Sequence, residues 1–93
     1  MRVAAAIERK LTAAFTPERL EVFDESHRHA GHAGARPEGE THFQVRIVAA
    51  SFAGQGRVAR QRAIYKVLAD ELAGPVHALA LEALTPEEAA ARS

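Results

Sequence analysis

The chain has 93 residues, with 12 basic and 12 acidic side chains, five histidines and no cysteine. Its length and its 47 % hydrophobic content are typical of a single domain, 1–93, and exclude a disordered or fibrous chain. The lack of cysteine excludes a disulfide framework, a cysteine zinc site and a thiol nucleophile. No apolar run approaches the ~18 residues of a membrane span, and no signal-peptide block is present, so we expect a cytoplasmic protein without a membrane partner.

The first half of the chain predicts one helix and two strands. Apolar residues recur at every fourth position over 3–15, which is the pattern of an amphipathic helix. Thr16-Pro17 ends this helix, because the residue before proline is pushed out of the helical region. Alternating apolar and polar residues then predict strands over 19–25 and 42–49.

The segment between these strands, residues 27–41, predicts a long flexible loop. It contains three glycines and a proline and is longer than a hairpin needs. Three of the five histidines, His27, His29 and His32, lie in it. Histidine is a common metal ligand, but spacing alone does not specify a metal site. A solvated polar loop and a metal-binding loop therefore remain as interpretations.

The second half predicts a helix over 58–72, a strand over 76–81 and a last helix that starts at Thr85. Gly74-Pro75 ends the long helix, and Thr85 opens a capping box. The alanine-rich residues 88–93 have little to bury, so we expect a frayed tail.

The order of elements is therefore α-β-β-α-β-α. The first two strands can form an antiparallel hairpin, whereas the helical crossover to the third strand favours parallel pairing. The expected fold class is α+β, a small mixed three-stranded sheet with helices on one face.

His77 interrupts the apolar third strand and shares one predicted face with Leu79 and Leu81. We interpret it first as a buried histidine with a satisfied hydrogen bond. The alternative is a functional group at the exposed start of the strand.

The zero net charge of the chain hides an uneven distribution. Residues 1–40, 41–69 and 70–93 carry net charges of −1, +5 and −4. The neutral total argues against a general nucleic-acid binder, whereas the acid-free middle is a candidate binding segment.

The helix of this segment does not have the pattern of a recognition helix. At 100° per residue, Arg62 and Lys66 lie together, and Arg60 lies on the other side of an apolar arc. This arc is formed by Val58, Tyr65, Leu68 and Leu72. A recognition helix gathers its basic residues on the outer face. The pattern predicts either a solvated surface helix or a partner-binding surface.

Two further motifs carry little weight. Asp24, Glu25 and Ser26 resemble parts of a catalytic relay, but neighbouring strand residues point to opposite faces. Gly31-His32-Ala33-Gly34 spells the GxxG loop of KH domains, but it lies between strands, whereas that loop joins two helices.

Four blocks of the sequence together resemble the BolA family. They are Leu-Glu-Val-Phe-Asp-Glu-Ser-His-Arg-His (20–29), Glu-Thr-His-Phe-Gln-Val (40–45), Arg-Gln-Arg-Ala-Ile-Tyr (60–65) and Leu-Ala-Asp-Glu-Leu-Ala-Gly-Pro-Val-His-Ala-Leu-Ala-Leu (68–81). The resemblance, to the subgroup with a loop histidine, implies a KH-like (class II) fold. It also implies a non-enzymatic partner of monothiol glutaredoxins that acts in iron–sulfur cluster trafficking and iron homeostasis.

The resemblance implies particular ligands for a 2Fe-2S cluster shared with the partner. The histidine of the Val-His-Ala-Leu strand is His77, and the loop ligand aligns with His29, with His27 and His32 as alternatives. His42 also matches a family histidine, to which we give a structural role. Two imidazoles can replace two thiolates on one iron, and glutaredoxin and glutathione would supply the others. The chain alone, a monomer or weak homodimer, would hold no cluster.

The leading interpretation is thus a cluster-sharing adaptor. Arg57, Arg60, Arg62 and Lys66 are expected to form its partner-binding or nucleic-acid-binding surface. The alternative is a DNA-binding transcriptional regulator of morphology and stress response, and a third possibility is an interaction module without a metal. The adaptor requires an exposed His77, whereas DNA binding requires the basic groups on one face.

Overall fold

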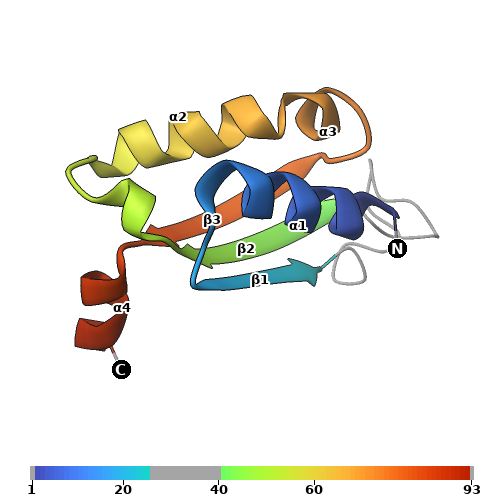
Figure 1. The fold of residues 1–93 in the computed structure, drawn as a ribbon. Helices are drawn as coiled ribbons and strands as arrows, with labels where there is room; N and C mark the ends of the chain where they lie inside the picture. Colours follow the sequence, from blue (N-terminus) through green and yellow to red (C-terminus); the bar gives the residue numbers. More distant parts are fainter. Residues whose placement is uncertain (1, 26–40, 93) are drawn as a thin grey trace.

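The computed structural model describes residues 2–25 and 41–92, and its elements follow the predicted order (Figure 1). They are α1 (Arg2–Phe15), β1 (Arg19–Asp24), β2 (His42–Val48), the short 3-10 helix η2 (Ala50–Phe52), α2 (Arg57–Val67), α3 (Ala69–Ala73), β3 (Ala78–Leu84) and α4 (Pro86–Arg92). The predicted loop 27–41 lies outside the described residues except for Thr41, which is completely buried.

The sheet has the predicted mixed topology, with strand order β1-β2-β3. β1 pairs antiparallel with β2, and β2 pairs parallel with β3. The register places Val22 opposite Val45, and Val45 opposite Leu81. Apolar residues of all three strands therefore point to the same face.

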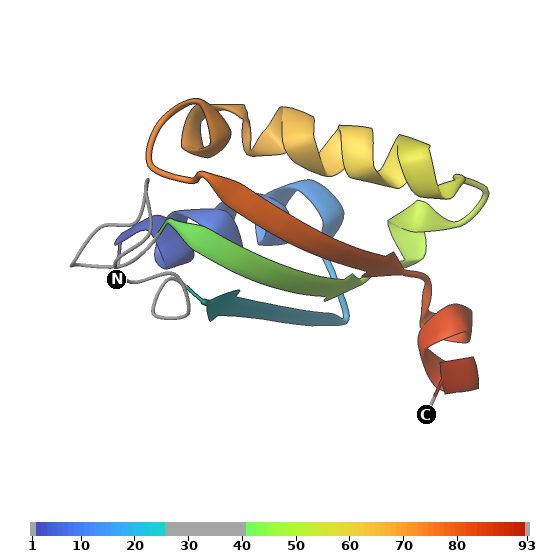
Figure 2. The same cartoon turned by 180° about the vertical axis from the view of Figure 1, so that it is seen from behind.

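Helices α1, α2 and α3 cover this face, whereas α4 projects from the end of β3 toward the other side of the sheet (Figures 1 and 2). The core between the helices and the sheet is formed by Ile7, Leu11, Phe43, Val45, Ile47, Ala49, Phe52, Ile64, Leu68 and Val76. The opposite face of the sheet is open to solvent along much of its length, and Phe23 on that side is 44 % exposed.

The predicted helix 58–72 is two helices in the structure. Leu68, with φ −100° and ψ 21°, separates α2 from α3. Glu71 of α3 then meets Lys10 of α1, with the Lys10 amino group 2.8 Å from one carboxylate oxygen. The pKa of Lys10 is raised, chiefly by its hydrogen bond to Glu71. This ion pair ties α3 to α1.

The predicted apolar arc of α2 is wrong at two positions. Val58 is 58 % exposed and Tyr65 is 40 % exposed, whereas Ile64 and Leu68 are buried. The side of α2 that carries Ile64 packs against α1 and the sheet. The apolar side chains on the outer side of the helix cannot reach these contacts. Val58 and Tyr65 therefore lie on the solvent side of the helix.

The third strand and the last helix also differ from the predicted boundaries. β3 begins at Ala78, two residues later than predicted, because Val76 is a core anchor ahead of the strand. The Thr85 capping box is present, with the Glu88 amide donating to Thr85 Oγ1. Helix α4 runs to Arg92, and its Glu88 and Arg92 side chains pair with Arg60 and Glu82 outside the helix. In the part of the chain that the structure describes, no helix is long and apolar enough to cross a membrane.

Candidate functional site

The predicted ligand His77 is exposed, immediately before β3. Our first interpretation, a buried core histidine, is therefore wrong. Leu79 and Leu81 point toward the core, as the alternation of the strand predicts. His77 does not follow this alternation, because β3 starts only at Ala78. The exposed start of the strand, the second interpretation, is what the structure has.

The backbone of His77 is nevertheless firmly held. Val76 before it is only 4 % exposed, and its amide donates to the carbonyl of Glu71 in α3. The amide of His77 donates to the carbonyl of Thr41 over 2.7 Å. An exposed side chain on a fixed backbone is a suitable arrangement for a ligand.

A second histidine, His42, lies beside His77. The two ring centres are 6.2 Å apart, and the ring planes are inclined by 31°. The Nδ1 atom of His42 is hydrogen-bonded to Thr41 Oγ1 over 2.8 Å. The sequence predicts only a structural role for His42. The parallel register of β2 and β3 pairs His42 with Ala78, the residue after His77. A prediction of this register would have indicated that the two rings lie close together.

The chain segment that carries the other predicted ligands starts and ends at this same edge of the sheet. The amide of Glu25 donates to the carbonyl of His42 over 2.7 Å, and Thr41 lies next to His77. His27, His29 and His32 fall between Glu25 and Thr41 in the chain, outside the described residues. We call the edge formed by Glu25, Thr41, His42 and His77 the histidine edge.

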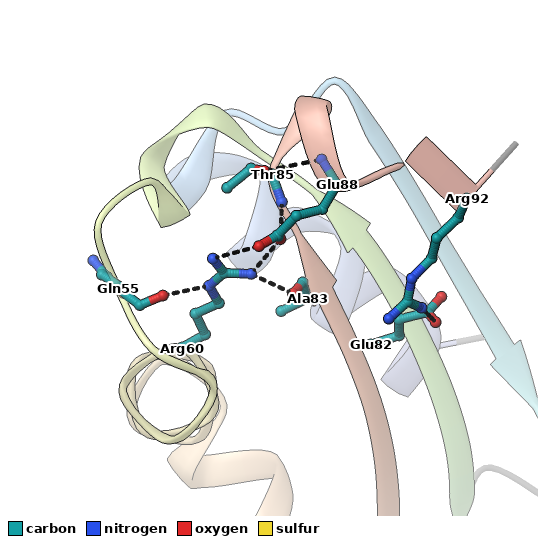
Figure 3. A network of polar contacts seen from close by, with 7 residues as sticks. All are labelled: Gln55, Arg60, Glu82, Ala83, Thr85, Glu88 and Arg92. Carbon is teal, nitrogen blue, oxygen red and sulfur yellow. Dashed lines mark hydrogen bonds and ion pairs between the residues drawn. The ribbon is translucent and has the colours of Figure 1, made fainter. Parts of the chain in front are cut away.

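Arg60, predicted as part of a binding surface, lies at the opposite end of β3 and is engaged inside the molecule (Figure 3). Its guanidinium donates to the carbonyls of Gln55 and Ala83 over 2.9 and 3.0 Å. It also forms two hydrogen bonds, of 2.6 and 3.2 Å, with the carboxylate of Glu88. Only 11 % of the Arg60 side chain is exposed. A partner would have to displace Glu88 to reach it.

The remaining predicted basic residues, Arg57, Arg62 and Lys66, are exposed on α2. Arg46 lies on the open face of the sheet, where it pairs with Glu82 over 2.7 Å and approaches Glu21. The five basic groups of the acid-free segment are thus divided among a helix surface, an internal contact and the opposite side of the sheet. They do not form one basic face.

The comparisons with known proteins agree with this fold. A scan against protein families matches residues 11–88 to BolA, described as "BolA-like protein". The chain belongs to the BolA family. Members of this family are non-enzymatic.

Relatives of the BolA family resemble the chain over nearly all of its length. It is 48 % identical to mouse "BolA-like protein 1" over 86 residues, which are 92 % of this chain and 60 % of the mouse protein. It is also 48 % identical to the Escherichia coli "DNA-binding transcriptional regulator BolA" over 88 residues, 95 % of this chain and 80 % of that protein. The chain thus spans about three fifths of the mouse relative.

The fold is also that of solved BolA structures. The BolA domain of SufE1 from Arabidopsis thaliana superposes with a TM-score of 0.85 at 44 % identity, covering 95 % of this chain and 96 % of that chain. The likeness therefore extends over the whole three-stranded sheet and its helices.

The histidine edge of this BolA-family chain offers imidazoles as candidate metal ligands. Among residues 2–25 and 41–92, no group of three histidine or carboxylate side chains is placed to hold a metal. The imidazoles of His42 and His77 lie close together, while His27, His29 and His32 lie outside the described residues, and the chain has no thiolate to add. Two histidines can serve one iron of a 2Fe-2S cluster, but the second iron then needs thiolates from elsewhere.

Proposed function

We propose that this protein is an adaptor that pairs with a monothiol glutaredoxin and glutathione and shares a 2Fe-2S cluster with them. Its role would be iron–sulfur cluster trafficking and iron homeostasis. His77 is the fixed ligand, and His29 from the segment after β1 is the second, with His27 and His32 as alternatives.

The observation that carries this proposal is the position of His77. Its imidazole is exposed, its backbone is bonded to Thr41, and the residues that flank the histidine-rich segment lie beside it. A ligand at the rim of a fold can reach a metal held by another protein, whereas a buried one cannot. Imidazole also loses metal as it protonates, which suits transfer better than storage.

The exposed residues of α2 are the expected docking surface. Arg62, Tyr65 and Lys66 are all exposed on it, so the surface combines positive charge with apolar area. Lys66 is in the last turn of α2, at the end that leads to α3 and on to the start of β3 (Figure 1). A partner with acidic side chains around its cluster would complement this surface.

The decisive experiment mixes the protein with a cluster-loaded monothiol glutaredoxin and records visible absorption and circular dichroism. We expect a heterodimer with a spectrum that differs from that of the glutaredoxin alone. His77→Gln should abolish this change, whereas Gln44→Glu, on a neighbouring strand, provides a control for a local surface change. An unchanged spectrum with His77→Gln would refute the ligand assignment.

DNA binding is the second candidate, favoured by the name of the Escherichia coli relative. The divided arrangement of the five basic groups supports it less well, because DNA contacts need positive charge on one face. The test is a salt titration of affinity for duplex DNA. A log–log slope near zero would rule out phosphate contacts, and a slope steeper than about −3 would favour this function.

A further inference from the structure

His42 and His77 are paired by the fold independently of any partner. His42 is the first residue of β2, and its strand register pairs it with Ala78, the residue after His77. The backbone bonds from His77 and Ala78 to Thr41 hold the two strand starts together. The separation of the two backbone positions that carry the imidazoles is therefore set by the sheet.

The distance between the rings is within the reach of a single metal ion. Imidazole nitrogens bind zinc at about 2.0–2.1 Å, and a ring centre lies roughly 1.1 Å behind the nitrogen, so two rings on one ion have centres at most ~6.4 Å apart. The observed separation is 6.2 Å. Rotation of the exposed His77 side chain would shorten this distance to the value of a bent, tetrahedral-like arrangement.

Thr41 gives His42 the environment of a metal ligand. Thr41 is completely buried, and its hydroxyl oxygen lies 2.8 Å from Nδ1 of His42. Metal-binding histidines characteristically use the second ring nitrogen in a hydrogen bond that fixes the orientation of the ring. A metal at His42 would therefore be bound through Nε2.

We propose that His42 and His77 form a binding site for a divalent transition-metal ion that prefers imidazole, such as Zn²⁺ or Ni²⁺, on the protein without a partner. Water would complete the coordination. This site goes beyond the proposed cluster sharing, with which it has only His77 in common. An ion at the pair would compete with the cluster for that imidazole.

The test is a Zn²⁺ titration of the protein alone, followed by NMR of the histidine ring nitrogens. We expect the resonances of His42 and His77 to shift together with one dissociation constant. His42→Gln and His77→Gln should each weaken zinc binding at least tenfold. A variant with His27, His29 and His32 all changed to Gln should still show the coupled shift of the pair.

Changes at Thr41 separate an effect on the site from a loss of folding. Thr41→Val keeps both imidazoles and should weaken zinc binding by about 10–100-fold, the usual effect of losing such a hydrogen bond. Thr41→Ser should restore it. Backbone spectra of each variant report whether the fold is retained.

The proposal is overturned if His42→Gln binds Zn²⁺ as tightly as the unmodified protein while folded, or if only the loop histidines shift. The cluster-sharing function fails in a different experiment, when His77→Gln leaves the heterodimer spectrum unchanged. His42→Gln should lose the zinc site and keep the shared cluster. The two proposals can therefore fail separately.

Discussion

The carboxylate of Glu88 is held at the same time by the guanidinium of Arg60 and by the backbone amide of Thr85 (Figure 3). Glu88 thus completes the capping box of α4 and joins this helix to α2. Arg60 also bonds the Ala83 carbonyl and lies 5.9 Å from the centre of the Phe52 ring. A single arginine therefore connects α2, β3, α4 and the core.

We predict that Arg60→Met lowers the stability of the fold. The change removes the donors to two backbone carbonyls and the partner of Glu88, and losses of this kind cost about 1–3 kcal/mol. Urea unfolding measures the change in the free energy of unfolding. Arg62→Met, an identical substitution on the exposed side of α2, should change it by less than about 0.5 kcal/mol. Equal losses in the two variants would contradict a structural role for Arg60.

The Glu88 contacts should make stability depend on pH. The hydrogen bond from Arg60, followed by that from the Thr85 amide, lowers the pKa of Glu88 from 4.5 to about 2. A carboxylate with a lowered pKa stabilises the folded state above its unfolded pKa and loses this effect as the pH falls toward its folded pKa. The advantage of the wild type over Glu88→Gln should therefore be constant from pH 7 to about 5 and disappear toward pH 2.

Thermal unfolding of the two proteins across this range measures that advantage as a difference in Tm. Glu87→Gln is the matched control, because Glu87 is an exposed carboxylate one position earlier in α4. Its difference from the wild type should be small at every pH. A Glu88→Gln difference that persisted undiminished to pH 2 would show that the ion pair is not its cause.

The fold could be predicted because its signals are local. Apolar residues recur with a four-residue period over 3–15 and alternate with polar residues along β2. Each pattern arises within a single element that buries one of its faces, so it can be read from that segment alone. Thr16-Pro17 and Gly74-Pro75 end helices through their own backbone restrictions. The break at Leu68 could not be predicted in this way, since it contains neither glycine nor proline and brings Glu71 to Lys10, which is 61 residues away.

The site was less predictable because it depends on which elements meet. The sequence identified His77 as a candidate but placed it inside the third strand on its apolar face, whereas β3 begins only at Ala78 and leaves His77 exposed ahead of it. The pairing of His42 with His77, which are 35 residues apart in the chain, needs the register of β2 and β3. The sequence placed Arg60 in a basic surface. Its ion pair with Glu88 depends on the direction in which α4 leaves β3, which the sequence does not indicate.

Charge reversal along α2 should affect partner binding according to position. At about 1.5 Å per residue, Lys66 lies ~14 Å along the helix from Arg57, toward the histidine edge. We predict that Lys66→Glu slows association with a glutaredoxin most, Arg62→Glu less and Arg57→Glu least. Stopped-flow association rates at low and high salt measure the effect, which screening should reduce. Equal effects at the three positions would indicate steering by net charge alone.

The ion pair between Lys10 and Glu71 gives the last prediction. Glu71 is only 9 % exposed, so removal of its cation leaves a carboxylate in a poorly solvated position. Lys10→Met alone should therefore lower the urea midpoint of unfolding. Glu71→Leu alone should lower it less, because the Lys10 side chain, at 28 % exposure, can still reach water. The double variant should be more stable than Lys10→Met, since replacing both members of such a pair with apolar groups avoids the unpaired charge. A double-mutant cycle on urea unfolding measures this coupling, with Lys66→Met as the control on an exposed lysine. Strictly additive effects would mean that α1 and α3 are held together by their apolar contacts and that the ion pair contributes nothing.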